Sequence, residues 1–281
     1  MSPDEAAFVE SYSEEVLDTF TAKFEADDRF PDWSRLARRF REATNSVLKH
    51  GFSKFSAVEA THNELCIAEA LLASEKPRFA RLDYEPALNG YNQSIDFRAT
   101  AENGLTLFVD VKTIQPESKD KWDQFQTAKD EQRFPDNIIV ALRENGLGGE
   151  LWHSMFAPRG RILEYTRKLE RKIADGSLVR TNTFFILALC GEGFDWREAE
   201  LENFVAFYRT GVHRPDDKFS KMELEYIRQK AISLTRTITQ FACMRRTQGG
   251  VQPEVNWNVS APGDKFVRVR TSCSSSKPGT R

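Results

Sequence analysis

The sequence predicts an α/β or α+β fold, because segments of helical periodicity alternate with segments of strand periodicity. Residues 1–60 repeat apolar positions at helical spacing. Residues 93–114 alternate apolar and polar side chains with a period of two, which is typical of strands. Two short apolar runs, at 137–142 and 183–189, have the length and composition of buried strands. No other fold class accommodates all of these segments.

The predicted elements divide the chain into four parts. These are a helical accessory region over 1–60, a core over 61–190, a C-terminal accessory region over 191–270 and a tail over 271–281. The tail is rich in serine, so we expect it to be disordered. Besides the hairpin at 93–114, we expect helices over 61–74, 121–132, 159–174, 196–208 and 221–234, and strands over 79–85, 137–142, 183–189, 241–244 and 254–259.

Composition places the chain among soluble globular proteins. Its 281 residues are 40% hydrophobic and 29% charged, which suits a core domain with accessory elements. We find no run of 18 apolar residues and no leader segment, so we expect neither membrane insertion nor secretion, and a cytoplasmic location. A net charge of −2 argues against a protein that coats nucleic acid along its whole surface.

The segment at 93–114 reads as a β-hairpin whose polar face carries two aspartates and a lysine. If Gly104 closes a three-residue loop in the left-handed conformation, Ala101 pairs with Leu105 and Asp96 lies across from Asp110. The predicted apolar face is formed by Ile95, Phe97, Ala99, Leu105, Leu107, Val109 and Val111.

Two carboxylates on opposite residues lie about 5 Å apart and repel each other unless a cation lies between them. A divalent metal ion would fill that role. Lys112 follows Asp110 by two residues, so it points the same way and brings an ammonium group beside the pair. The alternative is a solvent-facing surface on which Asp96, Arg98, Asp110 and Lys112 form exposed ion pairs. Phe108 on this face argues against it, since it suggests a strand covered on both faces.

The order of a helix with a glutamate, a strand with Asp96, and then Asp110-Val111-Lys112 resembles the PD-(D/E)xK phosphodiesterase superfamily. This resemblance implies a restriction-endonuclease-like αβββαβ core with a mixed central sheet over roughly 60–190. An N-terminal helical layer and C-terminal helices and strands would be added to that core.

The same resemblance implies a further acid from the helix over 61–74. Glu64 is chosen over Glu69, because family members place this glutamate about two turns before a hydrophobic pair, here Leu71 and Leu72. The alternative for Glu64 is a carboxylate in the first helical turn, stabilised by the helix dipole.

The resemblance further implies a metal-dependent nuclease that hydrolyses DNA, most simply an endodeoxyribonuclease in restriction, defence, mobile-element or repair biology. Asp96, Asp110 and the Val111 carbonyl would bind Mg²⁺ or Mn²⁺, Glu64 would complete the shell directly or through water, and Lys112 would orient the attacking water. The alternative is a catalytically silent nucleic-acid-binding or protein-interaction module on the same fold. The choice between DNA and RNA, strandedness, and assembly into a homodimer or larger complex stay open.

Overall fold

The structure, a computed structural model, describes residues 1–86, 94–114, 158–174, 182–190, 198–211, 228, 234–245, 254–259 and 270–271. The predicted helix over 121–132 and the strand over 137–142 lie outside these ranges, as does the helix over 221–234 except for residues 228 and 234. Thr271, the first residue of the predicted tail, belongs to a short strand, and residues 272–281 lie outside the described ranges.

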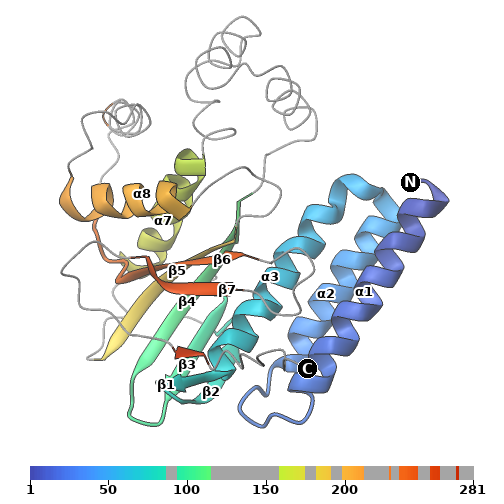
Figure 1. Cartoon of the computed structure of the whole chain (residues 1–281), viewed down its shortest axis with the longest axis horizontal. Helices are drawn as coiled ribbons and strands as arrows, with labels where there is room; N and C mark the ends of the chain where they lie inside the picture. The colour runs from blue at the N-terminus through green and yellow to red at the C-terminus, as the bar shows by residue number, and fades with distance from the viewer. Residues whose placement is uncertain are drawn as a thin grey trace, which may run out of the picture.

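The N-terminal part is helical, as its periodicity predicted. It consists of α1 (Pro3–Phe24), α2 (Trp33–His50), the short 3₁₀ helix η1 (Phe52–Lys54) and α3 (Phe55–Leu72). Helix α1 begins with a capping box, in which Ser2 and Glu5 satisfy each other's backbone N–H groups. Helix α3 begins at Phe55, well before the predicted start at residue 61. The three long helices lie beside one another in Figure 1.

Within the described ranges, strands from both halves of the chain form one mixed sheet of six strands in the order β2-β3-β4-β5-β6-β7. The bounds are β2 (Phe79–Tyr84), β3 (Phe97–Ala101), β4 (Thr106–Thr113), β5 (Thr183–Cys190), β6 (Gln240–Arg245) and β7 (Glu254–Val259). Strands β4, β5 and β6 run parallel, and the other neighbours are antiparallel. A separate pair joins β1 (Ser74–Lys76) to β8 (Arg270–Thr271). The predicted α+β class is therefore confirmed.

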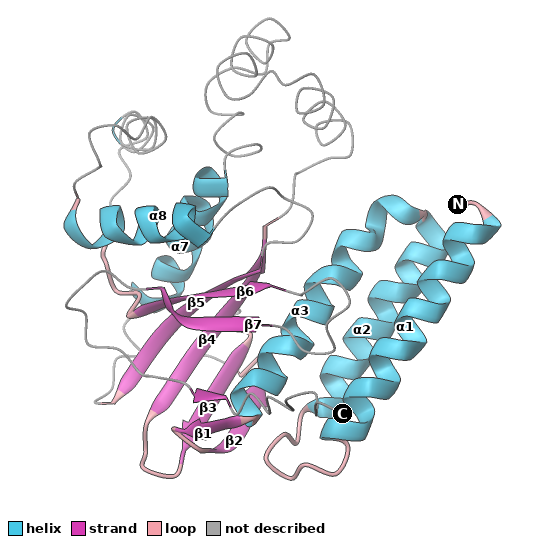
Figure 2. Cartoon of the chain, in the orientation of Figure 1, coloured by secondary structure: helices cyan, strands magenta, loops and turns pink. Residues whose placement is uncertain are grey.

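Helices cover both faces of the sheet (Figure 2). One hydrophobic cluster joins α1, α2 and α3 to the first face, and a second joins α7 (Pro158–Ala174) and α8 (Glu198–Thr210) to the other face. Alternate residues of β5 enter the two clusters: Ile186 belongs to the first and Leu187 to the second. Because helices cover β5 on both faces, its side chains are apolar along the strand and do not alternate between apolar and polar.

The hairpin of β3 and β4 has the predicted register. Gly104 has φ +80° and closes the loop, and the Ala101 N–H donates to the Leu105 carbonyl over 2.8 Å. Phe97 then pairs with Val109. The prediction for Ile95 was wrong, since Ile95 packs in the second cluster with Phe108 and not beside Phe97. The reason is a bend at Asp96, just before β3 begins, which breaks the alternation.

From α3 onward the described elements follow the order α3-β1-β2-β3-β4-α7-β5, in which β1 belongs to the separate pair with β8 and not to the main sheet. Because β4 and β5 are parallel neighbours, the chain between them must cross over one face of the sheet, and α7 lies on that crossover. The crossover brings α7 against the face of β4 that carries Asp110 and Lys112. In the described ranges, no helix has both the length and the apolar composition needed to cross a bilayer.

Candidate active site

Three oxygens converge on one cation at the end of β4. The Lys112 Nζ lies 3.2 Å from Asp96 Oδ2, 3.1 Å from Asp110 Oδ2 and 2.9 Å from the Val111 carbonyl oxygen. Asp110 is completely buried and Asp96 is 8% exposed. The sequence-predicted aspartates, carbonyl and lysine are thus gathered around a single point.

A bend and two hydrogen bonds hold Asp96 in this group. Its Oδ2 accepts a hydrogen bond from the Val111 N–H over 2.6 Å, and its carbonyl accepts one from the Glu85 N–H over 2.8 Å. Asp96 lies just before β3 and is not paired with a residue of β4, so the prediction that it pairs directly with Asp110 was wrong. Its carboxylate instead contacts the Val111 N–H and the Lys112 ammonium. Burial, followed by the charge of Asp110, raises the pKa of Asp96.

The lysine that joins the two acids is held in its charged form. Burial alone would lower the pKa of Lys112, but the carboxylates of Asp96 and Asp110 outweigh it and raise the pKa. The exposed ion-pair alternative does not describe this arrangement, because Asp110 has no contact with solvent. Arg98, the other cation of that alternative, binds Asp83 on β2 at 2.8 Å.

A second lysine joins the group from the crossover helix. Lys172, in the last turn of α7, donates to Asp110 Oδ1 over 2.8 Å. Lys172 was not among the site residues predicted from the sequence. The charged helix over 159–174 was expected, but nothing in the sequence indicates which of its basic residues faces β4. The contacts of α7 in the structure show it, because Lys172 and Tyr165 form hydrogen bonds with residues of β4.

Glu64 reaches the same region from α3. It lies in the middle of the helix, because α3 begins at Phe55, so the first-turn alternative is excluded. Its Oε2 accepts a hydrogen bond from the Tyr84 hydroxyl over 2.7 Å, and its Oε1 lies 3.7 Å from Arg39 Nη2. Burial, followed by the charge of Asp96, raises the pKa of Glu64 to about 7. Glu69 is directed elsewhere and pairs with Lys23 on α1.

Helix α3 is also tied directly to the end of β4. The Asn63 Nδ2 donates to Thr113 Oγ1 over 2.8 Å. Tyr165, on α7, donates its hydroxyl to the Thr113 carbonyl over 3.2 Å. Thr113 therefore connects the helical layers of both faces at the residue after Lys112, and Glu64 and Lys172 approach the aspartates from these two layers.

The donor set can be compared with the needs of a divalent metal ion. Among the residues that the structure describes, no three side chains of His, Cys, Asp or Glu are arranged to hold a metal. The oxygens around Lys112 Nζ, two carboxylate and one carbonyl, are nevertheless the type that Mg²⁺ prefers. Asp110 Oδ2 is buried and has no partner with hydrogen-bond geometry, although the Lys112 ammonium lies nearby. These residues fit a metal whose remaining ligands come from water or substrate.

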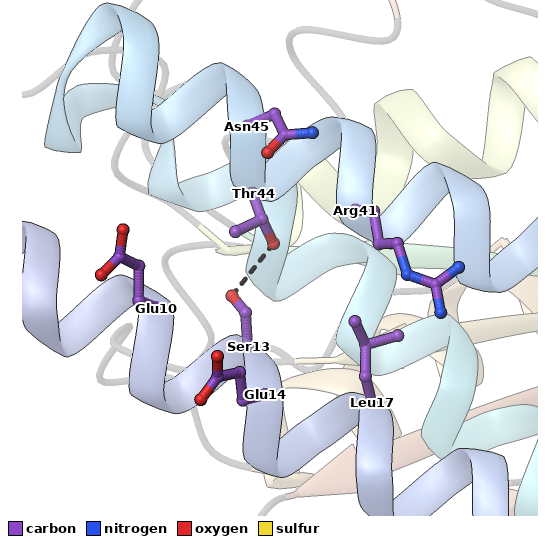
Figure 3. Close-up of a pocket in the computed structure, with 7 residues that line it drawn as sticks. All are labelled: Glu10, Ser13, Glu14, Leu17, Arg41, Thr44 and Asn45. Carbon is purple, nitrogen blue, oxygen red and sulfur yellow. Dashed lines mark hydrogen bonds between the residues drawn. The ribbon is translucent and has the colours of Figure 1, made fainter.

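The described pocket in Figure 3 is a separate feature. It has a volume of about 230 Å³ and lies between α1 and α2, where it is lined by Ser13, Thr44 and Arg41 among others. The hydroxyls of Ser13 and Thr44 bind each other at 3.0 Å, so its buried polar groups are already satisfied. None of the candidate site residues lines it.

No protein-family model, curated protein or solved structure matches the chain.

Proposed function

We propose that this protein is a Mg²⁺- or Mn²⁺-dependent nuclease that hydrolyses phosphodiester bonds in DNA and belongs to the PD-(D/E)xK superfamily. The observation that carries the proposal is the convergence of Asp96 Oδ2, Asp110 Oδ2 and the Val111 carbonyl on one cationic point. When β1 is set aside, because it pairs with β8 outside the main sheet, the described order α3-β2-β3-β4-α7-β5 is compatible with the αβββαβ order that the resemblance implies.

The chain's own residues would perform three tasks. Asp96, Asp110 and the Val111 carbonyl, which surround the Lys112 ammonium, would hold the metal ion. The Lys112 ammonium would bind the phosphate or orient the attacking water. Glu64, in its ionised form, would complete the shell of the metal ion directly or through water. The bound ion would lower the pKa of a water molecule and neutralise charge on the phosphate.

Burial is what makes this arrangement suited to catalysis. Charges within a water-poor site interact more strongly than charges on the surface, so fixed groups stabilise a developing charge without first reorganising. Asp96 and Asp110 are buried, and Lys112 is 23% exposed, which leaves one side of the group open to a ligand.

A second candidate function has a specific observation in its favour. Lys112 and Lys172 already balance the charges of Asp96 and Asp110, so the group needs no metal ion to be electrically neutral. A catalytically silent nucleic-acid-binding or protein-interaction module would have this property. We rank this function second, because neutralising the two aspartates does not require the Val111 carbonyl to lie beside the Lys112 ammonium as well.

Cleavage assays with matched variants test the proposal. Supercoiled plasmid and a short single-stranded DNA are incubated with Mg²⁺, Mn²⁺ or EDTA. We expect wild-type protein to cut DNA only with the metal, and Asp110→Asn to be inactive. Glu102→Gln is the control, because Glu102 lies in the exposed hairpin loop and its side chain is 64% exposed.

The same assay separates the two candidates. Metal-dependent cutting that is lost in Asp110→Asn and kept in Glu102→Gln supports the nuclease. DNA binding without cutting, together with no change in thermal stability on adding Mn²⁺, favours the silent module, since a ligand that binds the folded state must stabilise it.

A further inference from the structure

Arg39, on α2, connects the N-terminal helical layer to the candidate active site. Its Nη1 donates to the Tyr84 hydroxyl over 2.7 Å, and its Nη2 lies 3.7 Å from Glu64 Oε1. The same guanidinium pairs with the carboxylate of Glu85. Tyr84 in turn donates to Glu64. Arg39 therefore holds the helix acid both directly and through a tyrosine.

Glu85 carries this connection to the other acid. It follows β2 in the left-handed conformation, with φ +46°, which residues other than glycine adopt at a cost in free energy. In this conformation its N–H donates to the Asp96 carbonyl over 2.8 Å. Its carboxylate pairs with Arg39, and its Oε2 lies 3.4 Å from Arg35 Nη2. The bend at Asp96 is therefore stabilised by the backbone of Glu85, and the side chain of Glu85 is held in turn by two arginines.

We propose that Arg39 is a positioning residue of the candidate site, which holds Glu64 and, through Glu85, Asp96 in the geometry that catalysis requires. This inference rests on the proposed nuclease function. It assigns a task to the N-terminal helical layer: α2 fixes two acids that come from different elements, α3 and the start of the hairpin.

The chemistry of arginine suits this task. A planar guanidinium offers five donors in a fixed fork and remains charged at all accessible pH values, so one side chain can serve two carboxylates and a hydroxyl at once. A lysine at this position supplies the charge but not the fork. Replacement by lysine therefore separates the contribution of the charge from that of the geometry.

The test compares Arg39→Met and Arg39→Lys with the control Arg38→Met. Arg38 is the next residue of α2, its side chain is 70% exposed, and it pairs with Glu42 on the same helix. We expect Arg39→Met to lower kcat about 10–100-fold and to weaken Mn²⁺ binding, as the loss of groups that orient metal ligands does. KM for DNA should change little, Arg39→Lys should be intermediate, and Arg38→Met should keep the wild-type kcat.

Mn²⁺ titration by electron paramagnetic resonance, on protein shown to be folded by circular dichroism, gives a readout without turnover. A wild-type kcat with wild-type Mn²⁺ affinity in Arg39→Met overturns the proposal. A rise in KM at unchanged kcat also overturns it, because Arg39 would then bind the substrate directly. In both cases the wild type still cuts DNA, so the nuclease function survives. A wild type that neither cuts DNA nor binds Mn²⁺ overturns the proposed function and this inference with it.

Discussion

The Asp96 carboxylate accepts a hydrogen bond from the Val111 backbone N–H at 2.6 Å, which attaches a residue outside the strands to the middle of the candidate site. The bond holds the carboxylate beside Val111, the residue that separates Asp110 from Lys112. A charge-assisted hydrogen bond from a backbone N–H stabilises the ionised form of a buried carboxylate. Burial and the charge of Asp110 favour the protonated form, and they outweigh the hydrogen bond, so the pKa of Asp96 is raised.

Lys112→Met should separate metal binding from catalysis. Its ammonium is the group around which the three oxygens gather, so its removal leaves Lys172 as the remaining lysine that pairs with the two aspartates. We expect Mn²⁺ to bind about tenfold more tightly, a change of about 1.4 kcal/mol, while DNA cleavage falls by about 10²-fold or more. Isothermal titration with Mn²⁺ and the plasmid assay measure the two effects. An unchanged or weaker Mn²⁺ affinity would contradict the assignment of these oxygens as ligands.

Lys172→Met should destabilise the fold. Asp110 Oδ1 is buried and receives its hydrogen bond from this lysine, and a buried acceptor left without its donor costs about 1–3 kcal/mol. Urea denaturation measures the free energy of unfolding. The matched control is Lys168→Met, one turn earlier on α7. Lys168 is 49% exposed and pairs with Glu164, so its loss should cost less than about 1 kcal/mol. Equal effects of the two substitutions would refute the structural role of Lys172.

Glu64 should make the stability of the metal-free protein depend on pH. The pKa of its carboxyl is about 7 in the folded chain, against an ordinary value of 4.5. Below pH 4.5 the group is protonated in both states, and its contribution to stability is complete. As the pH rises the unfolded chain ionises first, so stability is lost up to about pH 7, by at most about 3 kcal/mol.

The corresponding measurement is urea denaturation of wild type and Glu64→Gln in EDTA at pH 5 and pH 8. Glutamine does not titrate, so the variant should gain stability relative to the wild type as the pH is raised. A difference between the two proteins that is the same at both pH values would show that Glu64 is not the group responsible.

Gly104 should matter for stability and not for chemistry. It has φ +80°, and a Cβ at this position would meet no atom within 4 Å, so only backbone strain opposes a side chain. We expect Gly104→Ala to lower the free energy of unfolding by about 1–2 kcal/mol. Gly104→Asn should lower it less, because asparagine tolerates the left-handed region. Thermal denaturation ranks the three proteins, and kcat should be unchanged; a loss of kcat in folded Gly104→Asn would contradict this.

The hairpin was predictable because its determinants are local. A glycine at the loop and the alternation on either side fix the register, so Asp110 and Lys112 could be placed on one face from the sequence. Phe108 predicted a strand covered on both faces, and the structure confirms this, with Phe108 stacked on Phe185 in the second cluster. The failure at Ile95 has a local cause as well, since alternation says nothing of where a strand begins.

Residues brought in by long-range packing could not be predicted. Arg39 and Lys172 reach the site only because α2 and α7 pack against opposite faces of the sheet, and no sequence pattern specifies that packing. Glu64 was selected through a family resemblance, and its partner Tyr84 was not anticipated. The roles of Asp96, Asp110, Lys112 and Glu64 in catalysis stay predictions, to be tested by the experiments above.

The parallel pairing of β4 with β5 sets the order in which this region assembles. The hairpin closes through a short loop, whereas the contact between Asp110 and Lys172 spans 62 residues, and the entropy lost on closing a loop increases with its length. We therefore expect the hairpin to form first, as contacts between distant residues generally form more slowly. During synthesis the two aspartates then meet before α7 arrives, and Lys112 is the neighbouring cation already present. On this expectation, α7 is the last of these segments to complete the candidate site.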